Sequence, residues 1–192
     1  QLRSLADMPA EEPRGSEVPP NLVRYLFDKR GELDDLELKD LVMAKTIVDV
    51  HRHRTAKHLV AVPLFALHPI HVIDRDGAIA ATERRAEVLG EVADELRAAG
   101  TLTEALLARH LPSVSHIKVV PVTDARPTEG DPSPAEYLAF EGNGRIAALQ
   151  RVFTPADGLT VEVERYDVDD PVKILRRLNR VRRWNGLEEL TT

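Results

Sequence analysis

The sequence predicts an α/β fold, of the α+β mixed kind, in which helices flank a small mixed sheet. Short apolar runs alternate along the chain with segments whose apolar residues recur every three or four positions, the respective patterns of strands and amphipathic helices. The 192 residues, 43% of them hydrophobic, suffice for one core without disulfide bonds, and the chain has no cysteine. We therefore expect a single globular domain.

Four regions are expected along the chain. Residues 1–20 contain four prolines among several acids, a composition typical of a flexible arm. Residues 21–58 show mixed apolar spacings that predict peripheral helices, and residues 59–167 hold the alternating strands and helices of the core. Residues 168–192 are expected to form a basic C-terminal helix.

The elements of the core follow from apolar runs and helix caps. Residues 59–67 form an almost continuous apolar run that predicts a strand buried on both faces, and Pro63 favours an edge or a bulge. A helix is expected over 83–99, with Thr82 as its N-cap and Glu83 as an acid of its first turn. The remaining expected elements are a helix at 102–110, a strand at 117–122, a loop at 123–134, a strand at 135–140, a helix at 146–153, a strand at 159–166 and a helix at 171–184.

The most informative segment is Glu141-Gly142-Asn143-Gly144-Arg145, between an expected strand and an expected helix. Its two glycines permit positive φ angles, and the N-terminus of a helix carries unpaired N–H groups with partial positive charge. Arg145 adds a fork of donors and Asn143 an amide, so the turn suits a phosphate. Glu141 could bind magnesium or a sugar hydroxyl, or accept a proton. The alternative is a turn whose glycines are steric and whose arginine pairs with a neighbouring acid.

The segment FEGNGRIAAL resembles the signature turn of the ParB/sulfiredoxin-like superfamily, which has the pattern D/E-G-x-x-R-x-x-A-L. The order of the expected elements over about residues 59–167 is also similar to that of the family core, although only the turn is specific. The resemblance implies a ParB/sulfiredoxin-like fold. The matching residues are Glu141, Gly142, Arg145, Ala148 and Leu149.

The resemblance also implies a ligand and a chemistry. Nucleotide phosphates are expected at Gly142, Asn143, Gly144 and Arg145, with ATP, ADP or CTP and magnesium as ligands. A phosphotransferase (kinase) or a nucleotide hydrolase would follow. Glu83 is a candidate catalytic base, because members that phosphorylate free serine use a glutamate from roughly this helix. Sulfiredoxin chemistry is excluded because the chain has no cysteine.

His68 follows the apolar run at 59–67, where ligand pockets of this family open. A role in proton transfer is one interpretation and a structural histidine is the other. We assign no residue as a dedicated metal ligand, because the sequence contains no His/Asp cluster at metal-ligand spacing that would support a nuclease. Nuclease activity, a frequent label in the family, has no support from the residues.

The net charge of −6 is unevenly distributed, because residues 171–192 contain six bases and two acids. The acidic body argues against broad nucleic-acid binding. The arginines are expected to cover the outer surface of the last helix, either as a solvated face or, in a noncatalytic module, as a surface that docks on nucleic acid or an acidic protein. The apolar runs are too short to span a membrane and the first residues lack an apolar leader, so we expect a cytoplasmic protein without a membrane partner.

Overall fold

The computed structural model describes residues 28, 31, 35–112, 114–122 and 136–190. The chain divides into two compact units, residues 1–52 and residues 53–192. The first unit contains almost all of helix α2 (Asp35–His53), in which Lys45 pairs with Asp49 at 3.0 Å. The expected arm at 1–20, the beginning of the expected peripheral helices and the loop expected at 123–134 lie outside the described residues.

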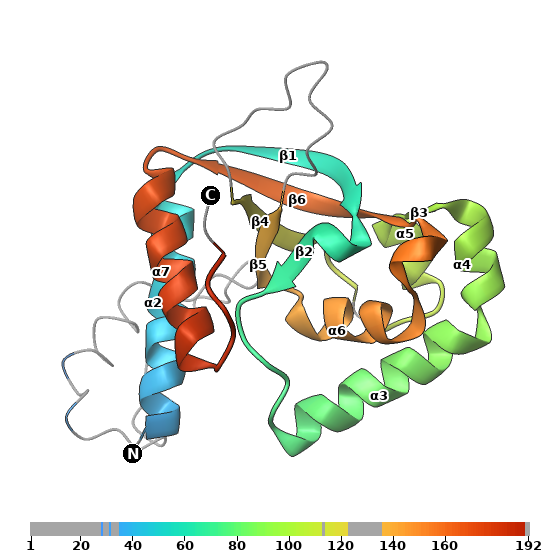
Figure 1. The fold of residues 1–192 in the computed structure, drawn as a ribbon, viewed down its shortest axis with the longest axis horizontal. Helices are drawn as coiled ribbons and strands as arrows, with labels where there is room; N and C mark the ends of the chain where they lie inside the picture. Colours follow the sequence, from blue (N-terminus) through green and yellow to red (C-terminus); the bar gives the residue numbers. More distant parts are fainter. Residues whose placement is uncertain (1–27, 29–30, 32–34, 113, 123–135, 191–192) are drawn as a thin grey trace, which may run out of the picture. The chain divides into compact units, whose positions relative to one another are not determined.

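The second unit is built on a mixed sheet with the strand order β1-β6-β4-β5-β2 (Figure 1). The strands are β1 (Arg54–Pro63), β2 (Leu67–Pro69), β3 (Thr101–Leu102), β4 (Ile117–Pro121), β5 (Tyr137–Glu141) and β6 (Thr160–Val168). Strand β6 runs antiparallel to β1 and parallel to β4 and β3, while β5 runs antiparallel to β4 and parallel to β2. Together with its flanking helices, this sheet confirms the predicted α+β mixed class.

Helices flank the sheet. They are α3 (Asp76–Glu91), α4 (Ala93–Ala99), α5 (Glu104–Ala108), α6 (Asn143–Val152) and α7 (Pro171–Trp184), with 3-10 turns η3 (Leu64–Ala66) and η4 (Pro155–Asp157). Helix α3 packs along α6 (Figure 1). Helix α7 has the predicted bounds, because Asp170 caps it by accepting the N–H of Lys173 and Pro171 occupies its first position. No helix in the described ranges is both long and apolar enough to cross a membrane.

The main core lies between one face of the sheet and the helices α3 to α6. Strand β5 is buried over its first four residues, and its side chains alternate between the two faces of the sheet. Ala139 joins the helix residue Ile146 in this core. On the opposite face, Phe140 packs edge to face against Tyr166, with ring centroids 5.1 Å apart. Burial on both faces thus fixes the end of β5, at Glu141, where the predicted site begins.

The single buried strand expected at 59–67 is wrong. Strand β1 ends at Pro63, a 3-10 turn follows, and β2 begins at Leu67. Proline has no N–H, so it cannot continue the ladder that β1 makes with β6. Strand β1 does lie at the sheet edge, as Pro63 indicated, but it is largely exposed, with Leu59 at 57%. It also starts at Arg54, so the peripheral helices do not extend to residue 58.

Two helix predictions also need correction. The helix expected at 83–99 begins seven residues earlier, at Asp76, because Asp76–Ala81 is rich in alanine and shows little hydrophobic periodicity. It is also divided at Val92 into α3 and α4. Thr82 is therefore a buried interior residue of α3 rather than its N-cap, and Glu83 does not lie in the first turn. The helix expected at 102–110 is the shorter α5, which Thr103 caps by accepting the N–H of Leu106 at 3.2 Å.

Gly142 makes the sharp turn from β5 into α6. Its backbone is left-handed, with φ of 89° and ψ of 16°. A Cβ at this position would lie 2.8 Å from Ile117 Cγ1 and 3.3 Å from Ile117 Cα. The turn is therefore packed tightly on the start of β4, and both the backbone angle and the available space require glycine.

We expect Gly142→Ala to lower the free energy of unfolding by about 2–5 kcal/mol, because a left-handed residue costs about 1–2 kcal/mol and overpacking about 1–3 kcal/mol. Gly158→Ala is the matched control. Gly158 also has a positive φ, of 62°, but a Cβ there meets nothing within 4 Å, so the expected loss is about 1 kcal/mol. Urea unfolding followed by circular dichroism measures both, and equal losses would contradict a tightly packed turn.

Candidate functional site

The site begins with the N-terminus of α6, which the turn at Gly142 directs toward the end of the sheet. The N–H groups of Arg145 and Ile146 both donate to the carbonyl of Gly142, at 3.0 and 3.1 Å. The N–H groups of Asn143 and Gly144, the first two of the helix, have no acceptor within it. The helix dipole adds partial positive charge at this point, so the end of α6 favours an anion.

Asn143 has a structural contact that the sequence did not indicate. Its side chain is only 4% exposed, and its Oδ1 accepts the backbone N–H of Ile70 at 2.9 Å. This bond ties the turn to the segment that follows β2, across 73 positions of sequence. Asn143 could therefore bind a phosphate, as predicted, only through its amide nitrogen and its backbone N–H.

The guanidinium of Arg145 lies beside the turn. Its Nη2 donates to Ser115 Oγ at 3.2 Å and would be 3.1 Å from a Cβ on Gly142. Burial lowers the pKa of Arg145, and the nearby positive charge of Arg85 lowers it further, while Glu141 and Glu104 raise it. Arginine stays charged at any ordinary pH. The downward shift of its pKa shows that burial and the repulsion by Arg85 outweigh the attraction of Glu141 and Glu104.

Helix α3 contributes two residues that sequence reasoning did not assign to the site. A Cβ on Gly144 would lie 3.3 Å from Arg85 Nη1 and 3.6 Å from Thr82 Oγ1. Thr82 is 6% exposed, and its hydroxyl has no hydrogen-bond partner in the described part of the chain. Within those same residues, no acidic side chain pairs with Arg85. Both groups therefore face the start of α6 with unused hydrogen-bonding capacity.

These groups form what we call the donor cluster. It consists of the N–H groups of Asn143 and Gly144, the guanidiniums of Arg85 and Arg145, and the hydroxyl of Thr82. The spacing of Thr82 and Arg85, three residues apart on one helix face, was the signal in the sequence. It was obscured because Thr82 was assigned to the helix N-cap. Chemically, the cluster can bind an anion with several oxygen atoms.

The predicted catalytic acid Glu141 already has a cationic partner. Lys118 Nζ lies 2.8 Å from Glu141 Oε2, and these residues are paired in the register of β4 and β5. Both side chains are largely buried, at 15% and 14% exposure. This pair holds the carboxylate beside the strand, which does not favour the proposed roles of Glu141 as magnesium ligand or proton acceptor.

The other two predicted catalytic residues have contacts away from the turn. His68, on β2, pairs through Nε2 with Glu136. Glu83 Oε1 lies 3.8 Å from Nη1 of Arg151. Arg151 is in the last turn of α6, seven residues from Gly144, which is about 10 Å along the helix. The contacts in the described residues therefore do not join Glu83 or His68 to the donor cluster.

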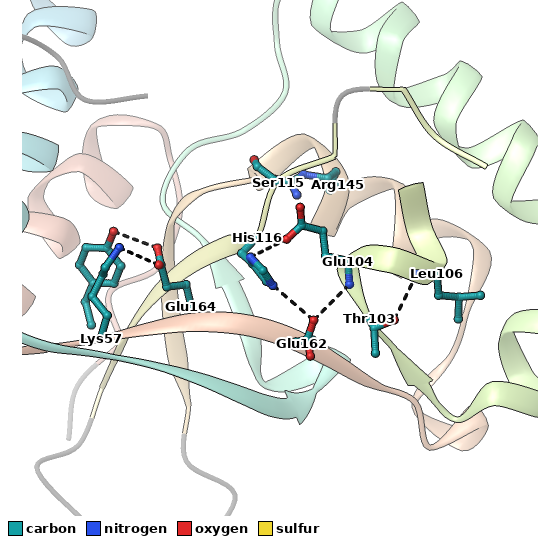
Figure 2. Close-up of polar contacts among 10 residues, drawn as sticks. Lys57, Thr103, Glu104, Leu106, Ser115, His116, Arg145, Glu162 and Glu164 are labelled. Atoms are coloured by element: carbon teal, nitrogen blue, oxygen red, sulfur yellow. Dashed lines mark hydrogen bonds and ion pairs between the residues drawn. The ribbon is translucent and has the colours of Figure 1, made fainter. Parts of the chain in front are cut away.

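A second polar cluster lies beside Arg145 and was absent from the sequence-based prediction (Figure 2). His116 lies between Glu104 and Glu162, with its Nδ1 2.6 Å from Glu104 Oε2 and its Nε2 3.3 Å from Glu162 Oε1. These residues come from three separate segments: the start of α5, the residue before β4, and β6. No local pattern could have brought them together.

Comparisons with known proteins do not assign this chain to a family. No family model, curated protein or solved structure matches this chain. Within the described residues, no group of three or more His, Asp or Glu side chains is placed to hold a metal ion. The chemistry of the site therefore rests on the geometry of the donor cluster and its neighbours.

We expect Arg85→Gln to raise the free energy of unfolding in the absence of ligand by about 0.5–1 kcal/mol at low salt. The change removes a charge that repels Arg145, and an exposed or half-exposed pair interacts with about this energy. Arg84→Gln, on the exposed side of the same helix turn, should change stability by less than about 0.3 kcal/mol. Chemical denaturation measures both, and a marked loss for Arg85→Gln would contradict the repulsion.

Proposed function

We propose that this protein binds a nucleotide or another phosphorylated ligand through the donor cluster. One observation carries the proposal: two guanidiniums and a buried hydroxyl that has no partner among the described residues face the same helix N-terminus. A phosphate has oxygen atoms enough to accept from all of them, and its negative charge would remove the repulsion between Arg85 and Arg145.

The magnitudes indicate which groups would dominate. A helix N-terminus alone contributes about 0.3–1 kcal/mol to binding an anion at an exposed position. A hydrogen bond from a charged donor contributes about 1.5–3 kcal/mol, and a guanidinium can make two such bonds to one phosphate. Arg145 and Arg85 would therefore supply most of the affinity, while the helix N-terminus and Thr82 would orient the phosphate.

The resemblance to the ParB/sulfiredoxin-like superfamily supports a nucleotide as the ligand. In that family the corresponding turn binds nucleotide phosphates, and here the turn lies between a strand and a helix as the resemblance requires. We therefore propose ATP, ADP or CTP as ligands and a cytoplasmic setting. Magnesium would accompany the phosphates, which together with water supply most of its ligands in many nucleotide sites.

The geometry favours binding over catalysis. Phosphoryl transfer depends on positioning and on neutralising charge, which the donor cluster could supply. It also needs a group that orients or deprotonates the attacking nucleophile. The three candidates for that role, Glu141, Glu83 and His68, are engaged with Lys118, Arg151 and Glu136. A kinase or hydrolase activity is therefore the weaker form of the proposal.

Calorimetric titration of the protein with ATP, ADP and CTP, each with magnesium, tests the proposal. We expect binding by the wild type and an affinity at least about tenfold lower in Arg145→Ala, since one charged hydrogen bond contributes about 1.5–3 kcal/mol. Arg84→Ala, which removes an exposed arginine on α3, is the matched control and should bind as the wild type does. Absence of binding by the wild type to all three nucleotides would overturn the proposal.

Gly144→Ala provides a second variant that alters no charge. Gly144 has an ordinary helical φ, so the methyl group is compatible with α6 and should leave stability unchanged or slightly higher. Its Cβ would occupy the space in front of Arg85 and Thr82. We expect weaker nucleotide binding without loss of stability, and unchanged binding would show that the ligand does not enter that space.

We also propose that α7 contacts single-stranded nucleic acid. Arg176 and Arg180 are exposed one turn apart, and no acidic side chain pairs with either within the described residues. Trp184, 41% exposed, follows one turn later and offers a stacking surface. The expectation that all arginines of α7 face outward is wrong, because Arg182 is 6% exposed and donates to the carbonyls of Glu188 and Pro69. The exposed basic surface is therefore narrower than the sequence indicates.

Filter binding of a single-stranded oligonucleotide over a range of salt concentrations tests this second function. Replacing both Arg176 and Arg180 with alanine should flatten the slope of log affinity against log salt by about 1.4, because each phosphate contact contributes about 0.7. Arg109→Ala is the control, since Arg109 is already paired with Glu95. Absence of binding at low salt would discard this function, and an acidic peptide that binds in place of the oligonucleotide would replace it.

A further inference from the structure

His116 lies between two carboxylates beside the donor cluster. Both of its ring nitrogens face carboxylate oxygens, Glu104 at 2.6 Å and Glu162 at 3.3 Å (Figure 2). A neutral imidazole has one N–H donor, whereas the imidazolium has two. In either form, His116 can donate a hydrogen bond to the Glu104 carboxylate through the closer contact, at Nδ1.

This cluster adjoins the donor cluster through two neighbouring contacts. Ser115, the residue before His116, accepts a hydrogen bond from Arg145 Nη2 at 3.2 Å. Glu104 acts electrostatically on Arg145, since it raises the pKa of that guanidinium. The carboxylate of Glu104 thus contacts His116 and also attracts Arg145. Any loss of its attraction to His116 leaves more of it available to Arg145.

Glu162 fixes the position of this arrangement. Its Oε1 faces His116 and also accepts the backbone N–H of Glu104 at 3.3 Å. Glu162 lies on β6, whose neighbouring residue Val163 is paired with Ile117 at the start of β4. The pairing of β4 with β6 therefore positions His116, and the bond to Glu162 positions the start of α5. Of the three side chains in this cluster, Glu104 is the one whose charge raises the pKa of Arg145.

We propose that His116 is a positioning residue of the donor cluster: its Nδ1 holds the Glu104 carboxylate and so leaves Arg145 available to an anionic ligand. This inference rests on the proposed function. A carboxylate beside Arg145 competes with a phosphate for the same donors, and its free charge repels the phosphate as well. His116 acts on the ligand through Glu104 and does not contact it.

The proposal predicts the effect of removing the His116 imidazole. The charged groups that face His116 are Glu104 of α5 and Glu162 of β6, and Arg145 of α6 adjoins it through Ser115. Lys118, on the following strand, is engaged with Glu141. Without its contact to His116, the Glu104 carboxylate is free to turn toward Arg145, so affinity for an anion falls.

Sulfate is the appropriate probe, because it is a divalent anion with four acceptor oxygen atoms. Titration of sodium sulfate at constant ionic strength, followed by the amide resonance of Gly144 in NMR spectra, should give about tenfold weaker binding for His116→Gln than for the wild type. His58→Gln is the matched control, because His58 also pairs with a carboxylate, Asp167 at 3.0 Å, near the far end of β6.

Rescue separates this role from a merely structural one. The double variant His116→Gln/Glu104→Gln should recover sulfate affinity to within about threefold of the wild type, since the competing carboxylate is gone. A structural loss at His116 would not be restored by a second substitution. If the wild type binds sulfate and nucleotide but His116→Gln binds equally well, this inference fails alone. If the wild type binds neither sulfate nor nucleotide, the proposed function fails together with this inference.

Discussion

The close approach of Gly142 to Ile117 is the constraint on which the site depends. Because no side chain fits between the turn and the start of β4, the chain can pass from β5 into α6 only along one path. That path places the N–H of Ile70 against Asn143 and the guanidinium of Arg145 against Ser115. Residues remote in sequence therefore meet at the helix N-terminus because a single glycine permits the backbones to touch.

The donor cluster is an unfavourable arrangement without a ligand. Arg85 and Arg145 repel one another, the helix dipole adds positive charge of its own, and a buried threonine hydroxyl has no partner in the described residues. These groups lower the free energy of unfolding, which is typically only about 5–15 kcal/mol, so the cluster does not stabilise the fold. Strain of this kind is typical of functional sites, where the missing charge and acceptors are supplied by what binds there.

What the sequence could predict was local, and what it could not predict depended on packing. The turn at Gly142 and the bounds of α7 follow from neighbouring residues, so both were identified correctly. The start of α3 was missed because alanine-rich segments carry little hydrophobic periodicity. Thr82 lies in the site only because α3 packs along α6. His116 contacts Glu162 only because of the register of β4 and β6. Such contacts have no counterpart in spacing along the chain.

Net charge is a poor guide to this protein because its charges act over short distances. At physiological salt an exposed charge is screened beyond about 8 Å, so a chain of net charge −6 does not exclude an anion from a local positive group. Around α6 the balance is set by few side chains: Lys118 neutralises Glu141, His116 retains Glu104, and two arginines remain in excess. Glu141 and Glu104 are each bound to another side chain, Lys118 and His116, so the positive charge of Arg85 and Arg145 would remain available to an anion.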